Sequence, residues 1–253
     1  MRRLFLLLAA ITATLVVASG VALAVTNIGT DGPDTLRGTN GADNLLGEGG
    51  QDDLFGQGGT DNLLGGEGKD WVLGGNERRP QGGDKNLVGG SGNDGVNGGN
   101  GSDTVLGGSG NDFVHGDNGS DRAVVGGEGK DFVDGGRGSD RMLGEGGGDY
   151  LVDGPLGEGS KDDVLSSGDG DDILLGDHVP AVKDIVSCGG GFDRVMADSK
   201  DVVADDCEKV RVVHGSKAEV RQQEDAFFKS LPPAQRKFFD TFFEEQLAPF
   251  PNE

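Results

Sequence analysis

The chain has few of the residues from which an ordinary globular core is built. Only 34% of its 253 residues are hydrophobic and 6% are aromatic, with a single Trp and a single Tyr. Basic side chains are scarce as well, because 22 Lys and Arg stand against 44 Asp and Glu, for a net charge of −22. This shortage excludes nucleic acid as an expected partner, since phosphate recognition needs a basic surface.

The abundant residue types make folding harder still. The sequence contains 50 glycines, and glycine loses more backbone freedom on ordering than any other residue. A chain of low hydrophobicity and high net charge stays disordered in water unless something else orders it. Cations that neutralise the acidic side chains are the natural candidate.

The first 24 residues have the pattern of a secretory signal. Arg2 and Arg3 precede an apolar run over residues 4–17, and Ala22-Leu23-Ala24 forms a small-residue cleavage motif. The alternative is an uncleaved membrane anchor. We expect residues 1–24 to be removed and the mature protein to be secreted and extracellular, with cell-surface association left open.

The chain has only two cysteines, Cys188 and Cys207. In an oxidising compartment such a pair favours a disulfide over a metal pair or a redox site. The sequence also lacks the C-x-x-C spacing that would support either alternative. We therefore predict a Cys188–Cys207 disulfide.

A glycine- and aspartate-rich motif recurs every nine or ten residues from Gly29 to Leu175, as in "GGSGNDFVH", "GGEGKDFVD" and "GGRGSDRML". Glycine occupies positions 1 and 4, Asp position 6 and an aliphatic residue position 8. One damaged repeat spans residues 74–88, where Lys85 takes position 6 and predicts a weakened site. A second insertion is placed at residues 153–156.

This pattern, G-G-x-G-x-D-x-U-x with U a large aliphatic residue, resembles the RTX (hemolysin-type) family of calcium-binding nonapeptide repeats found in secreted bacterial proteins. The resemblance implies an all-β fold over residues 25–176, a right-handed parallel β-roll with two nonapeptides per coil and Ca²⁺ between stacked turns. Positions 1–6 form a tight turn that directs carbonyl and carboxylate oxygens, the ligands of Ca²⁺, toward one point. Positions 7–9 form a short strand with position 8 facing inward.

The predicted metal ligands are the aspartates at position 6. They are Asp34, Asp43, Asp52, Asp61, Asp70, Asp94, Asp103, Asp112, Asp121, Asp131, Asp140, Asp149, Asp162 and Asp172. Stacking places these carboxylates in close succession, which is strongly repulsive without counter-ions. We expect the calcium-free chain to be largely unfolded, with calcium binding and folding as one event.

The outward positions of the strands differ between alternate repeats. Position 9 of the even repeats is aliphatic throughout: Leu46, Leu64, Val88, Leu106, Val124, Leu143 and Leu165. Position 7 of the odd repeats includes Trp71, Phe113, Phe132, Tyr150 and Ile173. Such columns arise from ladder stacking of like side chains or mark a contact surface.

The C-terminal third departs from the repeat. Residues 177–214 contain degenerate repeats, with Asp184, Asp193 and Asp201 at position 6, and are expected to form a disulfide-linked cap. Residues 215–253 form a Phe-rich helical tail, with a helix capped by Ser230 that begins near Pro232 and Pro233. Phe227 and Phe228 precede it, and its spaced apolar residues are Phe238, Phe239, Phe242, Phe243 and Leu247. Docking on the roll, contact with a partner or a membrane surface, and disorder all remain open for this tail.

No catalytic motif is present. His115, His178 and His214 are scattered, and neither a G-x-S-x-G elbow nor a nucleotide-binding context surrounds the glycines. We predict a protein that is not an enzyme: a secreted calcium-binding β-roll acting as a structural or binding module. One alternative is a non-catalytic accessory or polysaccharide-binding, surface-adhesion subunit of an extracellular enzyme or cell-surface assembly. Another is an ice-binding surface.

Overall fold

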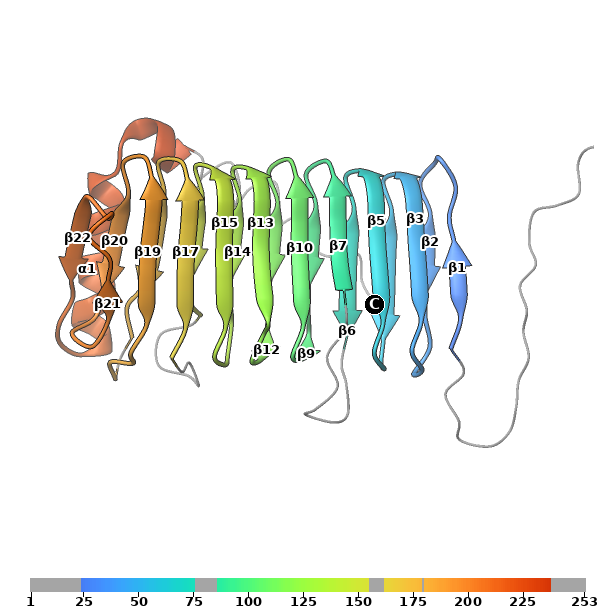
Figure 1. Cartoon of the computed structure of the whole chain (residues 1–253), viewed down its shortest axis with the longest axis horizontal. Helices are drawn as coiled ribbons and strands as arrows, with labels where there is room; N and C mark the ends of the chain where they lie inside the picture. The colour runs from blue at the N-terminus through green and yellow to red at the C-terminus, as the bar shows by residue number, and fades with distance from the viewer. Residues whose placement is uncertain (1–23, 76–85, 155–161, 179, 238–253) are drawn as a thin grey trace, which may run out of the picture.

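The computed structural model describes residues 24–75, 86–154, 162–178 and 180–237. Their strands form two ten-stranded sheets in which all pairs are parallel. Successive strands alternate between the sheets, and each pairs with the equivalent strand of the next coil (Figure 1). The predicted all-β parallel solenoid is confirmed.

The strands in each sheet follow chain order. Sheet A contains β1 (Thr26–Ile28), β3 (Asn44–Gly50), β5 (Asn62–Gly68), β7 (Asn86–Ser91), β10 (Thr104–Ser109), β13 (Ala123–Gly129), β15 (Arg141–Gly147), β17 (Val164–Asp169), β19 (Ile185–Gly190) and β21 (Val202–Val203). Sheet B contains β2 (Thr35–Arg37), β4 (Asp53–Gln57), β6 (Trp71–Gly75), β8 (Gly95–Asn97), β11 (Phe113–His115), β14 (Phe132–Asp134), β16 (Tyr150–Val152), β18 (Ile173–Gly176), β20 (Arg194–Ala197) and β22 (Lys209–Val212). Two short strands, β9 (Asn100–Gly101) and β12 (Asn118–Gly119), pair within the turns.

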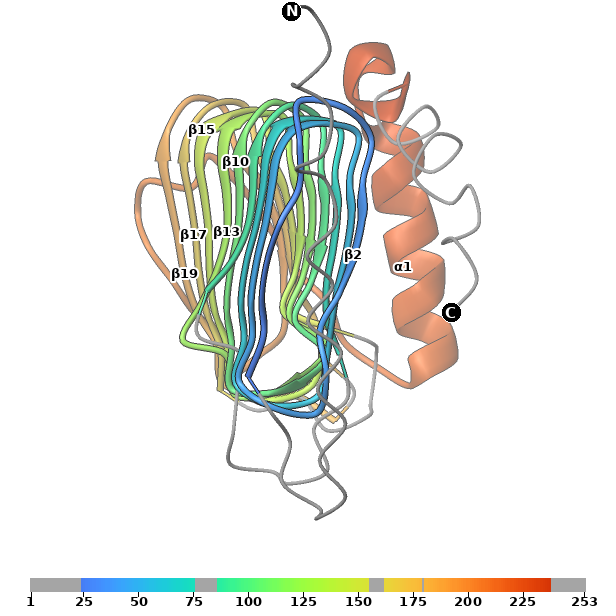
Figure 2. The same ribbon diagram turned by 90° about the vertical axis from the view of Figure 1, so that its right-hand side faces the viewer.

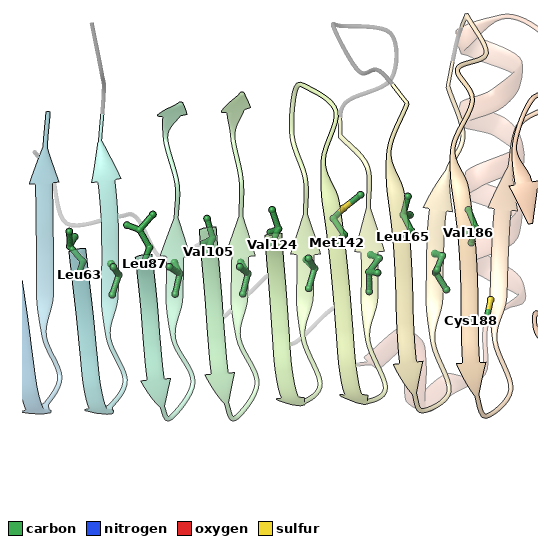
Figure 3. Packing of buried hydrophobic residues seen from close by; sticks show 14 of the residues in the cluster. Leu63, Leu87, Val105, Val124, Met142, Leu165, Val186 and Cys188 are labelled. Carbon is green, nitrogen blue, oxygen red and sulfur yellow. The ribbon is translucent and has the colours of Figure 1, made fainter. Parts of the chain in front are cut away.

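The position-8 side chains form the core between the two sheets. In sheet A they form a continuous column from Leu63 through Val105 and Met142 to Val186 (Figure 3). Each is at most 1% exposed. The core is therefore one aliphatic side chain per strand, repeated along the solenoid.

Two repeats are shifted by one residue from the register predicted for them. Val124 lies in the core opposite Val105, and Val125 takes the outward position beside Leu106. The extra residue of this ten-residue repeat is accommodated before β13, and a one-residue shift moves every following side chain to the other face.

The same correction applies two coils later. Leu165 is buried opposite Met142, and Ser166 takes the outward position beside Leu143. The prediction that Val124 and Leu165 face outward is therefore wrong. The outward aliphatic column of sheet A runs from Ile28 to Leu143 and ends at Ser166, which pairs with Ser187 in the next strand.

The solenoid continues through the degenerate repeats to β22. The predicted disulfide is confirmed, with the Cα atoms of Cys188 and Cys207 5.2 Å apart. Cys188 is fully buried at the end of the core column. The disulfide thus ties the last turn, which has no further coil to cover it, to the body of the solenoid.

One helix, α1 (Lys217–Ser230), lies along the outer face of sheet B (Figure 2). Its buried residues Val220 and Phe227 join a cluster with Tyr150, Ile173 and Met196. Docking of the tail on the roll is confirmed for this segment.

The start of α1 differs from the predicted helix. It begins after Ser216, whose N–H and hydroxyl both donate to the Glu219 carboxylate. Ser230 does not cap a following helix, because its hydroxyl donates backward to the carbonyl of Phe227. Residues 233–237 are helical again, as predicted near Pro233. Residues 238–253, and residues 1–23 of the predicted signal at 1–24, lie outside the described residues. Within the described ranges, no helix combines the length and apolar character of a membrane span.

Candidate metal-binding turns

The position-6 aspartates form two rows, one along each edge of the solenoid, and all but Asp34 and Asp201 are buried. Row 1 precedes the strands of sheet B and contains Asp34, Asp52, Asp70, Asp94, Asp112, Asp131, Asp149, Asp172 and Asp193. Row 2 precedes the strands of sheet A and contains Asp43, Asp61, Asp103, Asp121, Asp140, Asp163, Asp184 and Asp201. The structure thus brings together every predicted ligand except Asp162.

One carboxylate oxygen of most of these aspartates accepts a hydrogen bond from the preceding coil. The backbone N–H of Asp94 donates to Oδ1 of Asp112 at 2.8 Å, and that of Asp112 donates to Oδ1 of Asp131 at 2.8 Å. The same bond recurs along both rows. It links adjacent coils and fixes the direction in which the second oxygen points.

The second oxygen, Oδ2, is buried in most of these residues and makes no hydrogen bond. This holds for Asp52, Asp70, Asp94, Asp112, Asp121, Asp131, Asp140, Asp149, Asp172 and Asp193. A buried carboxylate oxygen without a partner is costly unless a cation approaches it.

The space in front of Oδ2 is bordered by backbone carbonyls. A Cβ placed on Gly107 would lie 2.6 Å from Oδ2 of Asp112 and 2.6 Å from the carbonyl oxygen of Gly126 in the next coil. A residue without a side chain therefore leaves room where a carboxylate and a carbonyl oxygen converge. An all-oxygen set of this kind suits Ca²⁺, so the residues present fit the metal.

Burial also raises the pKa values of these carboxyls. The pKa of Asp112 rises to about 6 and that of Asp94 to about 7, with desolvation as the largest cause. For Asp131 burial, followed by the neighbouring carboxylates Asp149 and Asp112, raises the pKa to about 8. Without cations these side chains compete for protons near neutral pH, and a divalent cation removes that conflict.

The predicted placement of Asp162 at position 6 is wrong. Asp162 is exposed, whereas Asp163 is buried and its Oδ1 accepts the N–H of Asp140 at 2.5 Å. The cause is the register of β17, in which Val164 rather than Asp163 pairs with Arg141. Asp184, Asp193 and Asp201 of the degenerate repeats continue the rows, whereas Lys85 lies outside the described residues.

A family model described as RTX calcium-binding nonapeptide repeat (4 copies) matches residues 28–63, 55–77, 87–123, 124–151 and 159–177. The chain belongs to the RTX family. A search among curated proteins found no matching relative. The cofactor of the RTX repeats is Ca²⁺, bound as multiple ions.

The structure also brings together residues that the sequence did not link. His178 is buried beside Asp153 and Asp184. The prediction that Asp153 belongs to an insertion is wrong, because Asp153 takes position 1 of its repeat, in register with Gly135 one coil earlier. The sequence feature that could have indicated this group is an acidic residue at a position where the RTX motif has glycine.

Proposed function

We propose that this RTX protein is a secreted module that folds when several Ca²⁺ ions bind between its coils and then serves as a structural or binding element without catalysis. The observation that carries the proposal is the row of buried Oδ2 atoms without hydrogen-bond partners. Each row-1 and row-2 aspartate in the list of predicted ligands, with Asp163 in place of Asp162, supplies one carboxylate oxygen to a calcium ion.

Calcium binding is coupled to folding because few stabilising interactions remain when calcium is absent. The core contributes one aliphatic residue per strand, and the chain must still order 50 glycines. The buried carboxylates then repel one another across adjacent coils. Metal binding supplies the missing stabilisation, since a ligand that binds only the folded state stabilises that state.

Secretion is supported by two features of the chain. Residues 1–24 carry the signal pattern, and the Cys188–Cys207 disulfide is typical of an oxidising compartment. Free Ca²⁺ is abundant outside cells, where weak extracellular sites operate at about 10⁻⁴–10⁻³ M. A chain that folds only on reaching that calcium concentration would remain extended until export.

Calcium titration by calorimetry with parallel circular dichroism tests this function. We expect the metal-stripped protein to lack a β-rich spectrum, to bind several Ca²⁺ ions and to gain that spectrum as they bind. Mg²⁺ at the same concentration is the control and should have little effect, because it requires stricter octahedral geometry. A β-rich spectrum in EGTA at about pH 8.5, where the buried carboxyls lose their protons, would overturn the coupling of folding to calcium.

A second role, as an accessory subunit of an extracellular assembly, is favoured by the outer face of sheet A. Helix α1 covers part of sheet B, whereas Ile28 and Leu64 of sheet A are 61% and 41% exposed. Exposed apolar columns of this kind often mark contact surfaces. A pull-down from culture medium with and without Ca²⁺ tests it, and an Ile28→Ser and Leu64→Ser variant should lose any partner that the wild-type protein retains.

A further inference from the structure

One turn of the roll departs from the calcium motif. In the turn before β17, position 1 is Asp153, whereas the coil before has Gly135 and the coil after has Gly176. The connection from β18 to β19 brings His178 to the same place. Asp184, the row-2 carboxylate that precedes β19, completes the group.

These three side chains are enclosed by the protein. The side chain of His178 is 1% exposed, and those of Asp153 and Asp184 are 2% and 0% exposed. The imidazole Nε2 lies 3.3 Å from Oδ1 of Asp153, and Nδ1 lies 3.4 Å from Oδ2 of Asp184. Neither ring nitrogen makes a hydrogen bond.

The distances are long for a histidine bonded directly to two carboxylates. Charge-assisted N–H···O bonds measure about 2.7–2.9 Å. Each observed N···O separation instead matches that of two ligands of one ion, because metal–ligand bonds of about 2.1 Å in a tetrahedral arrangement place the ligand atoms about 3.4 Å apart. One atom from each of the three residues can be chosen so that all lie within 4.8 Å of one another.

We propose that Asp153, His178 and Asp184 bind one transition-metal ion of the Zn²⁺ type. A buried imidazole nitrogen selects Zn²⁺ and related ions, whereas Ca²⁺ prefers oxygen ligands alone. The ion binds one ring nitrogen and the carboxylate beside it, and the other ring nitrogen faces the remaining carboxylate, which orients the ring once the ion is bound, as in the carboxylate–histidine arrangement of other metal sites. The ion thereby continues the row of cations with a different metal at one turn.

The electrostatics of the pocket support a bound cation. Asp153 is fully buried near the charged carboxyl groups of Asp184 and Asp163, so the pocket concentrates negative charge. In contrast to the calcium turns, this space contains a histidine and a carboxylate from position 1. The side chain of Asp153 fills volume that a glycine at that position leaves open.

Histidine NMR on the unmodified chain is the direct test. The sequence has three histidines, so the ¹⁵N spectrum of untagged protein in saturating Ca²⁺ contains three imidazoles. We expect Zn²⁺ to bind and to shift the His178 nitrogens, and Co²⁺ to give the visible absorption of a tetrahedral site. Resonances of His178 that do not move, or a ring that keeps both protons in excess Zn²⁺, would overturn the proposal and make the imidazolium itself the cation.

Paired variants give a second measurement. His178→Asn should bind about one Zn²⁺ fewer than the wild-type protein by calorimetry. The matched control is His115→Asn, because His115 also faces two carboxylates, Asp134 at 3.5 Å and Asp117 at 3.9 Å, but its side chain is 25% exposed. Equal Zn²⁺ binding by the two variants contradicts the site, and should His178→Asn fail to fold, the wild-type spectrum alone decides.

Discussion

At the scale of single residues, glycine at position 4 sets how closely the coils can stack. Gly110 has a φ of +132°, and a Cβ at this residue would lie 1.5 Å from the carbonyl oxygen of Gly92. Among the described residues no coil stacks before the first one, so a Cβ on the equivalent Gly32 would meet only the Thr30 hydroxyl, 3.9 Å away. A side chain at this motif position would therefore clash with the preceding coil inside the stack, whereas the first coil has room for one.

This contrast gives a paired prediction. We expect Gly110→Ala to destabilise the calcium-loaded protein by about 3 kcal/mol or more, through backbone strain and a steric clash. Gly32→Ala should change stability by less than about 0.5 kcal/mol. Urea unfolding in saturating Ca²⁺ measures both, and equal losses would contradict the account of stacking.

The assignment of Asp163 rather than Asp162 as the calcium ligand can also be tested. Asp163→Asn keeps an oxygen to accept the N–H of Asp140 but removes the charge, so we expect fewer Ca²⁺ ions bound and a lower midpoint of thermal unfolding. Asp162→Asn removes the same charge from an exposed position and should leave both quantities unchanged. Calorimetric titration of the two variants measures the stoichiometry, and a loss in Asp162→Asn alone would restore the original assignment.

The nine-residue period predicts most ligands because each repeat of standard length places its aspartate without reference to its neighbours. It fails where a repeat is longer, since an extra residue can be accommodated on either side of a strand. At Val124 and Leu165 the burial of the side chain decides the register, and that information belongs to the folded coil. The grouping of His178 with Asp153 could not be predicted either, because it depends on the path of the connection after β18.

At the scale of elements, the helix and sheet B stabilise each other by burying aromatic side chains. Phe113 and Phe132 stack with ring centroids 5.1 Å apart, and the column continues through Tyr150 toward Phe228 of α1 (5.2 and 6.1 Å). The aromatic column predicted from odd repeats is thus the surface on which the helix rests. The start of α1 was visible in the sequence as the Ser216–Glu219 capping pair, but the prolines further on indicated a later helix.

Docking of α1 predicts a large loss of stability when the side chain of one buried phenylalanine is truncated. Phe227 is 4% exposed against sheet B, and we expect Phe227→Ala to destabilise the calcium-loaded protein by about 3–5 kcal/mol. The control is Phe192→Ala, since Phe192 is 43% exposed and contacts the Arg194 guanidinium at 4.7 Å; it should cost about 1 kcal/mol or less. Thermal unfolding measures both, and a similar small effect at each position would indicate that α1 contributes little to stability.

At the scale of the whole molecule, the acidic residues destabilise the fold by repelling one another and make its stability depend on bound cations and protons. The chain carries a net charge of −22 and places two rows of carboxylates inside its fold. Two agents can relieve that repulsion: divalent cations, which the RTX turns bind, and protons. A fold that depends on neutralised carboxylates should therefore respond to pH in opposite ways with and without calcium.

The direction of the pH effect follows from the raised pKa values. Burial raises the pKa of Asp121 and Asp131 to about 8 and that of Asp94 to about 7, whereas Asp in an unfolded chain has a pKa of about 3.9. Because the folded state holds these protons more tightly, their contribution to stability is complete below about pH 4 and is lost as the pH rises through about 7–8. We expect metal-stripped protein to show more β structure by circular dichroism at about pH 5 than at about pH 8.5.

Calcium reverses this dependence, since protons compete with Ca²⁺ for the same oxygens. In limiting Ca²⁺ the midpoint of thermal unfolding should therefore fall as the solution is acidified from about pH 8 to about pH 5.5. Saturating Ca²⁺ at the higher pH is the control, where the fold should be complete. If the spectrum of the metal-stripped protein does not change between these pH values, the buried carboxylates do not govern folding, and the stability of the roll must come from its aliphatic core and glycine stacking alone.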